Sequence, residues 1–241
     1  MTPQSEAELA DIIAAAKGPM SIRGGGTRGS SGEGDPPSVA GLSGVTLYEP
    51  GALTLVVQAG TPVEGVKKVL AGENQRLAFE PMDHRGLLGT QGVPTMGGVF
   101  AANTSGPRRI QSGAARDFLL GVRFVDGRGD VLSNGGRVMK NVTGFDLSKL
   151  MSGSFGTLGV MHTVTLKVMP RDETSATIIV GVDDPQSAGK VMTRAMRSEN
   201  DVSAAAWIAS GDIRMLDIPK ASEVGSGFVM LRVEGPKPSV A

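Results

Sequence analysis

The chain has 241 residues, of which 40% are apolar, so it is long enough for one large domain or two smaller ones. Its 24 basic and 24 acidic residues balance, and no net positive field favours nucleic acid as a partner. The absence of cysteine excludes disulfides, a cysteine nucleophile and iron–sulfur ligation within the chain, and two histidines are too few for a histidine-rich metal site. No apolar run reaches the ~18–20 residues of a transmembrane segment, and the first residues lack a signal-peptide pattern, so we expect a cytosolic protein.

The N-terminal part predicts a helix followed by a short strand. Ser5 and Glu8 have the spacing of a capping box, and apolar residues recur on one face of the helix that follows. Gly18 and the proline after it end this helix. Residues 20–23 are predicted to form a strand that leads directly into a glycine loop at 24–29.

This glycine loop matches the G-x-G-x-x-G pattern of a dinucleotide-binding turn. That pattern requires a helix next, whereas residues 30–37 are serine, glycine, proline and acidic residues that cannot form one. The amides of such a loop can instead make a phosphate-binding concavity without a helix, and Arg23 and Arg28 flank it with positive charge. A solvated turn with two incidental arginines is the alternative.

Two strands and a helix are predicted next. Residues 45–48 and 53–58 have strand composition on either side of a proline–glycine turn. Thr61 and Glu64 form a second capping box, with Pro62 as the first helical residue.

Residues 89–107 form an almost uncharged, glycine-rich stretch around which the chain is organised. A helix is expected to begin near Met96 or Gly97, so that its unpaired N–H groups face whatever the preceding loop encloses. A tight turn into a buried helix, with no ligand, is the alternative interpretation.

A hairpin and a long strand complete this part of the chain. Residues 118–125 are apolar, and the turn at 126–129 leads them back into 130–132. Residues 160–168 alternate between apolar and polar side chains, which is typical of a half-buried strand. A further glycine cluster at 153–159 precedes that strand.

The pattern changes after residue 170, and we divide the chain into domains at 1–170 and 171–241. The second part predicts a β-α-β-β layer, with a helix opened by Asp184 and its following proline, and strands at 176–182, 204–210 and 228–233. These strands lack partners and a complete helical cover, so we expect this second domain to be incomplete.

Three glycine clusters that each leave or enter a strand suggest a long, flat, phosphorylated ligand. Several of the motifs around them also resemble those of a known family. The motifs at 22–27, 95–103 and 156–160 resemble the vanillyl-alcohol oxidase, or PCMH-type, family of FAD-binding domains. Further motifs at 79–81, 105–109, 116–121 and 138–151 are similar to those of the FAD-binding subunits of bacterial glycolate oxidases.

This resemblance implies an α+β fold, in which a PCMH-type FAD-binding domain of two α/β subdomains precedes an incomplete α+β cap domain. The first glycine loop would hold the pyrophosphate, the 95–103 turn would contact pyrophosphate, ribose and the flavin edge, and Gly159 would approach the flavin. The implied cofactor contacts are Arg23, Gly24, Gly25, Gly26, Thr27, Arg28, Pro81, Gly89, Thr95, Met96, Gly97, Gly98, Ala101, Asn103, Gly106, Gly159 and Val160. The sequence identifies neither a catalytic base nor a metal site.

Many relatives attach FAD through a histidine near the first glycine loop or through a cysteine. This chain has Thr27 and Arg28 there and no cysteine, so we expect FAD to be bound non-covalently. A side chain at Gly25 would block the approach of the amides to the phosphates and forbid a positive φ. His84 is expected on a surface loop, and His162 as a hydrogen-bonded core residue.

The resemblance implies an FAD-dependent oxidoreductase subunit that takes part in oxidising glycolate, a small 2-hydroxy acid, to glyoxylate. The implied partners are a related catalytic flavoprotein subunit and an iron–sulfur subunit, which would hold the complex in the cytoplasm or peripherally on the inner face of the cytoplasmic membrane. Two alternatives stay open: an independent FAD enzyme of the same fold acting on another 2-hydroxy acid or a nucleotide sugar, and a structural subunit whose flavin does not turn over.

Overall fold

The computed structural model describes residues 1–28, 37–137, 144–212 and 227–240. Most of the 30–37 loop and the start of the 138–151 motif lie outside these ranges. Contacts between residues divide the chain into two compact units, which we describe separately. The first comprises Met1–Gly106 and Gly113–Pro170, and the second Pro107–Ser112 and Arg171–Ala241.

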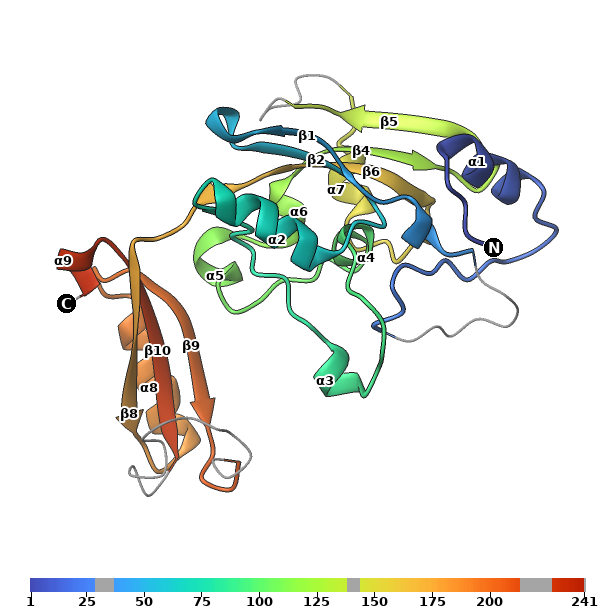
Figure 1. Ribbon diagram of the computed structural model, residues 1–241. Helices are drawn as coiled ribbons and strands as arrows, with labels where there is room; N and C mark the ends of the chain where they lie inside the picture. The colour runs from blue at the N-terminus through green and yellow to red at the C-terminus, as the bar shows by residue number, and fades with distance from the viewer. Residues whose placement is uncertain (29–36, 138–143, 213–226, 241) are drawn as a thin grey trace. The chain divides into compact units, whose positions relative to one another are not determined.

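The first unit is built on a five-stranded sheet in the order β1-β2-β6-β4-β5 (Figure 1). All four strand pairs are antiparallel. The strands are β1 (Val45–Glu49), β2 (Thr54–Gln58), β4 (Leu119–Val125), β5 (Val131–Gly135) and β6 (Val160–Lys167). The strands predicted at 45–48, 53–58, 118–125 and 160–168 are confirmed. The predicted hairpin between β4 and β5 is also confirmed, and an Asp-Gly turn marks it in the sequence.

Helices, two short 3₁₀ turns and a small two-stranded ladder surround this sheet. The helices of the first unit are α1 (Glu6–Ala14), α2 (Val63–Gly72), α3 (Arg85–Leu88), α4 (Met96–Ala101), α6 (Ala115–Phe118) and α7 (Leu147–Met151). The 3₁₀ turns are η1 (Val39–Gly41) and η2 (Pro50–Ala52), and the ladder pairs β3 (Gln75–Arg76) with β7 (Met169–Pro170).

Local signals fixed some of these boundaries and failed at others. The Ser5 hydroxyl accepts a hydrogen bond from the Glu8 amide at 3.2 Å, as the capping box predicts. The second capping box is wrong: Pro62 is the N-cap of α2, and the Thr61 hydroxyl instead accepts from the Gly44 amide and donates to the Gln58 carbonyl at 2.7 Å. The predicted strand at 20–23 is also wrong, because only Arg23 forms a β-bridge.

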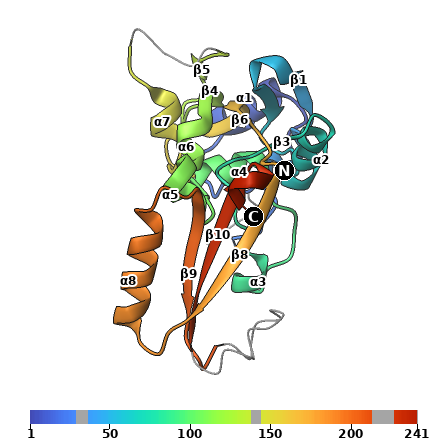
Figure 2. The same ribbon diagram turned by 90° about the vertical axis from the view of Figure 1, so that its left-hand side faces the viewer.

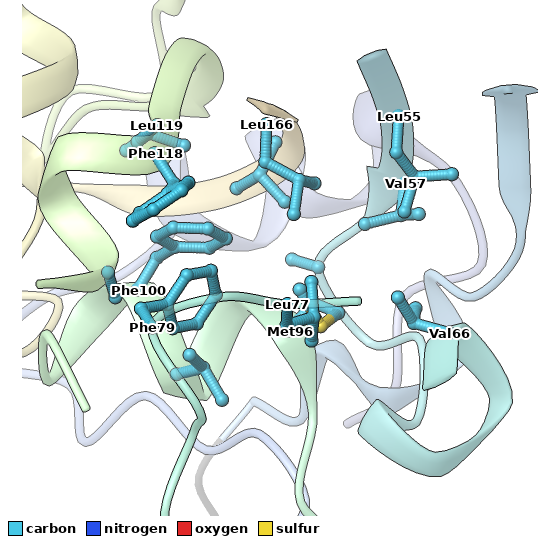
Figure 3. Packing of buried hydrophobic residues seen from close by; sticks show 14 of the residues in the cluster. Leu55, Val57, Val66, Leu77, Phe79, Met96, Phe100, Phe118, Leu119 and Leu166 are labelled. Atoms are coloured by element: carbon cyan, nitrogen blue, oxygen red, sulfur yellow. The ribbon is translucent and has the colours of Figure 1, made fainter. Parts of the chain in front are cut away.

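The core of the first unit lies between the sheet and helices α2, α4 and α6. Figure 3 shows Phe79, Phe100 and Phe118 packed together beneath Leu166 of β6. The ring centroids of Phe79 and Phe100 are 5.7 Å apart, and those of Phe79 and Phe118 are 5.4 Å apart. Each fully buried side chain of this size contributes about 1.5–3 kcal/mol to folding, so this cluster fixes α4 against the sheet.

The second unit is a three-stranded antiparallel sheet in the order β8-β10-β9, with α8 running alongside it (Figure 2). Its elements are α5 (Arg109–Ser112), β8 (Thr174–Gly181), α8 (Pro185–Met196), β9 (Val202–Ile208), β10 (Phe228–Gly235) and α9 (Lys237–Val240). The Asp184 carboxylate caps α8 by accepting from the amides of Gln186 and Ser187 at 2.9 Å. This arrangement confirms the β-α-β-β pattern expected from the sequence.

A buried ion pair joins the two sequence segments of the second unit. Arg108 lies next to α5, and its Nε donates to Glu234 Oε2 of β10 at 3.0 Å. The two side chains are only 7% and 10% exposed. Because removing one partner of a buried pair leaves an uncompensated charge, this contact strongly fixes the 107–112 segment to β10.

Candidate functional site

A cavity of about 1100 Å³ opens in the first unit between three segments of the chain. It is large enough for a dinucleotide-sized ligand. The lining residues are Pro19–Arg28, Val39, Pro94, Thr95, Gly97–Val99, Ala101, Ala102, Phe155–Thr157 and Gly159–Met161. One segment contains the glycine loop and another contains the start of α4. These two segments are far apart in the sequence and meet only in the folded chain.

The glycine loop packs tightly against the chain at 92–95. A Cβ on Gly25 would stand 1.6 Å from the Val93 carbonyl oxygen, and the Val93 amide donates to the Gly25 carbonyl at 3.2 Å. Gly26 has a positive φ of 71°, whereas Gly25 does not, so the positive φ expected at Gly25 is corrected. The backbone of Val93 leaves no room for a side chain at position 25. Glycine is therefore required there by the packing of the loop against residues 92–95.

In the ranges that the structure describes, the backbone N–H groups of residues 24–28 donate to no protein acceptor. Consecutive free amides in a glycine turn form a concavity that binds anions such as phosphate. The free amides are consistent with the phosphate cradle expected from the sequence, which stays a prediction.

Arg28 brings a positive charge to the same place. Its Nη1 donates to the Gly98 carbonyl at 2.8 Å, and its Nη2 donates to the Thr104 hydroxyl. Its Nε is buried and has no hydrogen-bond partner in the described part of the chain. Burial lowers the pKa of Arg28 from its ordinary range, but the guanidinium stays charged at neutral pH. A partly buried cation with an unused donor is suited to an anionic ligand.

The first amides of α4, by contrast, are already used. The Met96 amide donates to the Thr61 carbonyl at 2.9 Å, and the Gly97 amide to the Ala59 carbonyl at 2.7 Å. The Gly98 amide donates to the hydroxyl of Thr95, the N-cap. The expectation that this helix start offers free N–H groups is therefore wrong. Its glycine at 97 serves packing, since a Cβ there would lie 2.7 Å from the Ala59 Cβ.

The third wall comes from the segment before β6 and the first residues of that strand. Gly159 has a φ of 150°, and a Cβ there would lie 2.7 Å from the Val125 carbonyl oxygen of β4. Phe155 has a φ of 55°, and its amide donates to the Ala101 carbonyl at 2.9 Å. These contacts hold the wall against both the sheet and α4.

Most of the cofactor contacts predicted from the sequence line this one cavity. They are Arg23, Gly24, Gly25, Gly26, Thr27, Arg28, Thr95, Gly97, Gly98, Ala101, Gly159 and Val160. Arg23 is exposed and its guanidinium lies over Gly26, within 2.6 Å of where a Cβ would stand.

Five predicted contacts lie outside the lining. The Met96 side chain is fully buried in the hydrophobic core. Gly89 ends α3 in the left-handed conformation, and the Asn103 carboxamide accepts from the Arg116 amide at 2.9 Å. Gly106 packs against Glu80, whose carbonyl oxygen would lie 2.4 Å from a Cβ, while Pro81 simply does not reach the cavity.

Other lining residues were not among the predicted contacts. They are Pro19, Met20, Ser21, Ile22, Val39, Pro94, Val99, Ala102, Phe155, Gly156, Thr157 and Met161. Several of them adjoin the glycine motifs in the sequence. That proximity is the one feature from which the sequence could have predicted them.

Neither histidine lines the cavity. His84 lies in the irregular segment directly before α3, as the N-cap residue of that helix, and is partly buried. His162 Nδ1 lies 2.6 Å from the Thr163 hydroxyl and 3.6 Å from the Glu6 carboxylate, as expected of a hydrogen-bonded residue. Burial lowers the pKa of His162.

No cluster of three or more histidine, aspartate or glutamate side chains among the described residues could hold a metal ion. No helix in the described ranges has the length and apolar character needed to cross a membrane.

Comparison with known proteins agrees with this geometry. Residues 1–135 match the sequence model of a family described as an FAD binding domain. Over 135 residues the chain is 42% identical to the glycolate oxidase subunit GlcE of Escherichia coli (strain K12), which covers 56% of this chain and 37% of that protein. Over 141 residues it is 32% identical to the glycolate oxidase subunit GlcD of Bacillus subtilis (strain 168), covering 58% and 28%.

A solved structure shares the fold. Alkyldihydroxyacetonephosphate synthase superposes with a TM-score of 0.74 at 17% identity, covering 100% of this chain and 49% of the other. The chain thus spans less than half the length of each of these relatives. The family match extends over more than half of this chain and includes the glycine loop, Arg28 and α4. The chain belongs to the PCMH-type family of FAD-binding domains, and its cofactor is FAD.

Proposed function

We propose that the chain is part of the FAD-binding subunit of an enzyme that oxidises a small 2-hydroxy acid, converting glycolate to glyoxylate. The observation that supports the FAD site is the row of amides at 24–28 that have no acceptor among the described residues, beside the partly buried guanidinium of Arg28. The choice of glycolate is supported by the similarity to two glycolate oxidase subunits.

The residues of this chain bind and orient the cofactor. The amides of 24–28 and the guanidinium of Arg28 hold the negatively charged diphosphate, and the wall at 155–161 borders the rest of the ligand. FAD, when bound, supplies the acceptor for the hydride removed from the hydroxyl-bearing carbon.

The proton acceptor lies outside this cavity. None of the described residues that line it carries a carboxylate or an imidazole. General-base catalysis needs such a group within hydrogen-bond reach of the substrate. We therefore assign the base to another part of the protein or to a partner, and we expect this chain alone to oxidise glycolate negligibly.

The proposed partners are a related catalytic flavoprotein subunit and an iron–sulfur subunit that accepts the electrons. The chain has no cysteine, so a cysteine-ligated cluster would have to be carried by another subunit. We place the assembly in the cytoplasm, peripherally on the inner face of the cytoplasmic membrane through those partners.

The FAD is proposed to be non-covalent. None of the cavity-lining residues is a histidine or a cysteine, the two residue types through which relatives are expected to attach it. Acid precipitation should release all the yellow colour into the supernatant. Flavin fluorescence that stays with the denatured polypeptide on a gel would contradict this.

A second candidate is a subunit whose flavin never meets substrate. It is favoured because no carboxylate or imidazole lines the cavity in the part of the chain that the structure describes. Anaerobic mixing with glycolate separates the two, with flavin absorbance followed for the chain alone and for the chain assembled with its partner subunits. The proposal predicts bleaching of this chain's flavin only in the assembly. If this flavin stays oxidised while the complex turns over, the second candidate is correct.

A further inference from the structure

One aromatic side chain in the cavity wall has no structural role in the hydrophobic core. Phe155 lines the cavity and its side chain is 70% exposed. Five of the seven phenylalanines are buried, and the other exposed one, Phe145, does not line the cavity. An exposed phenyl ring at a ligand cavity is a candidate contact for an aromatic ligand.

The backbone holds this ring in place. Phe155 has a φ of 55°, which is uncommon for a bulky residue and persists only where its surroundings determine it. Three hydrogen bonds provide that constraint. The Gly153 amide and the Ser152 hydroxyl both donate to the Phe100 carbonyl, and the Phe155 amide donates to the Ala101 carbonyl. The turn is therefore fixed to the end of α4.

Helix α4 also anchors the phosphate site, so Phe155 and Arg28 are held by the same element. Arg28 donates to the Gly98 carbonyl, three residues before Ala101 on α4. Three residues of helix rise by about 4.5 Å, so the two anchoring points are less than one helical turn apart. A ligand whose diphosphate lies at Arg28 thus has one of its ring systems within reach of Phe155.

The chemistry of the wall selects between those ring systems. Ile22, Val160 and Met161 are apolar residues that line the same cavity, and the Ile22 side chain lies against Gly156, the residue after Phe155. The dimethylbenzene part of isoalloxazine is apolar, whereas adenine carries hydrogen-bonding groups around its edge. We propose that the Phe155 ring packs against the isoalloxazine of FAD and determines how tightly the flavin half of the cofactor is held. This inference rests on FAD occupying the cavity.

Titrations of the full chain with FAD and with ADP test it. ADP shares the diphosphate and adenine with FAD but has no flavin. Phe155→Ala should weaken FAD binding about tenfold to a hundredfold, the loss expected for one buried aromatic contact, and leave ADP binding unchanged. Phe155→Trp should keep FAD affinity within a few-fold and quench flavin fluorescence more strongly than wild type. Phe155→Leu separates aromatic packing from apolar bulk and should lie between wild type and Phe155→Ala.

The matched control is Phe145→Ala, which removes an 85% exposed ring outside the cavity and should change neither affinity. Thermal unfolding of each apo variant shows whether it is folded. Equal FAD affinity in wild type and folded Phe155→Ala would overturn the proposal, and so would an equal loss of FAD and ADP affinity. If wild type itself bound no FAD, the failure would lie with the cofactor assignment and not with Phe155.

Discussion

The substitution Gly25→Ala tests whether the loop's close packing shapes the phosphate site. The added Cβ would stand 1.6 Å from the Val93 carbonyl oxygen, whereas real Cβ contacts essentially never fall below 3.0 Å. The two segments must therefore separate by about 1.4 Å. Such a shift also breaks the 3.2 Å hydrogen bond from the Val93 amide to the Gly25 carbonyl.

Overpacking of this kind costs about 1–3 kcal/mol, and the lost hydrogen bond about 0.5–1.5 kcal/mol. We expect the loop to relax out of its native shape, so that FAD affinity falls by roughly 2–4 kcal/mol, at least about 30-fold. Isothermal titration with FAD measures this, and urea unfolding measures the loss of stability without ligand.

Gly65→Ala is the control, because this exposed glycine of α2 has nothing within 4 Å of its added Cβ. It should leave FAD binding unchanged and stabilise the helix by up to ~1 kcal/mol. If Gly25→Ala bound FAD as tightly as wild type, the packing of this loop would have no part in the site.

Three further predictions concern charge, core and pH. Arg28→Met should weaken FAD binding by about 1.5–3 kcal/mol by removing charge-assisted hydrogen bonds, whereas Arg128→Met, at a side chain 78% exposed, should leave the titration unchanged. Phe100→Ala should lower the free energy of unfolding by about 3–5 kcal/mol in urea, and a loss below ~1 kcal/mol would contradict the packing in Figure 3. Burial lowers the pKa of His162 below its ordinary 6.5, so on acidification the imidazole is protonated at a higher pH in the unfolded state than in the folded state. Stability should then decrease as the pH falls below about 6.5, until the lower native pKa is passed, and His162→Gln should remove this part of the pH dependence.

The sequence predicted the elements whose signals are local. The strands β4 and β6 carry continuous or alternating apolar residues, and the turn after β4 is an Asp-Gly pair. The glycine loop at 24–29 was identified as a phosphate cradle because its composition allows closely packed, exposed amides.

Features that depend on distant partners could not be predicted. The amides at the start of α4 are taken by carbonyls of Ala59 and Thr61, about 35 residues earlier, and no local pattern shows this. Arg108 and Glu234 are 126 positions apart, and nothing in either segment indicates their pairing. Phe155 lies in a glycine–serine turn, and only the fold shows that its ring is left in a cavity wall.

The most direct test of the account is amide hydrogen exchange of the chain with and without FAD. We expect FAD to slow exchange at residues 24–28 above all, since their amides have no acceptor among the described residues, and also in the wall at 155–161. The strands β8, β9 and β10 should be unaffected. Protection confined to those strands, or no protection at 24–28 at saturating FAD, would contradict the assignment of this cavity as the cofactor site.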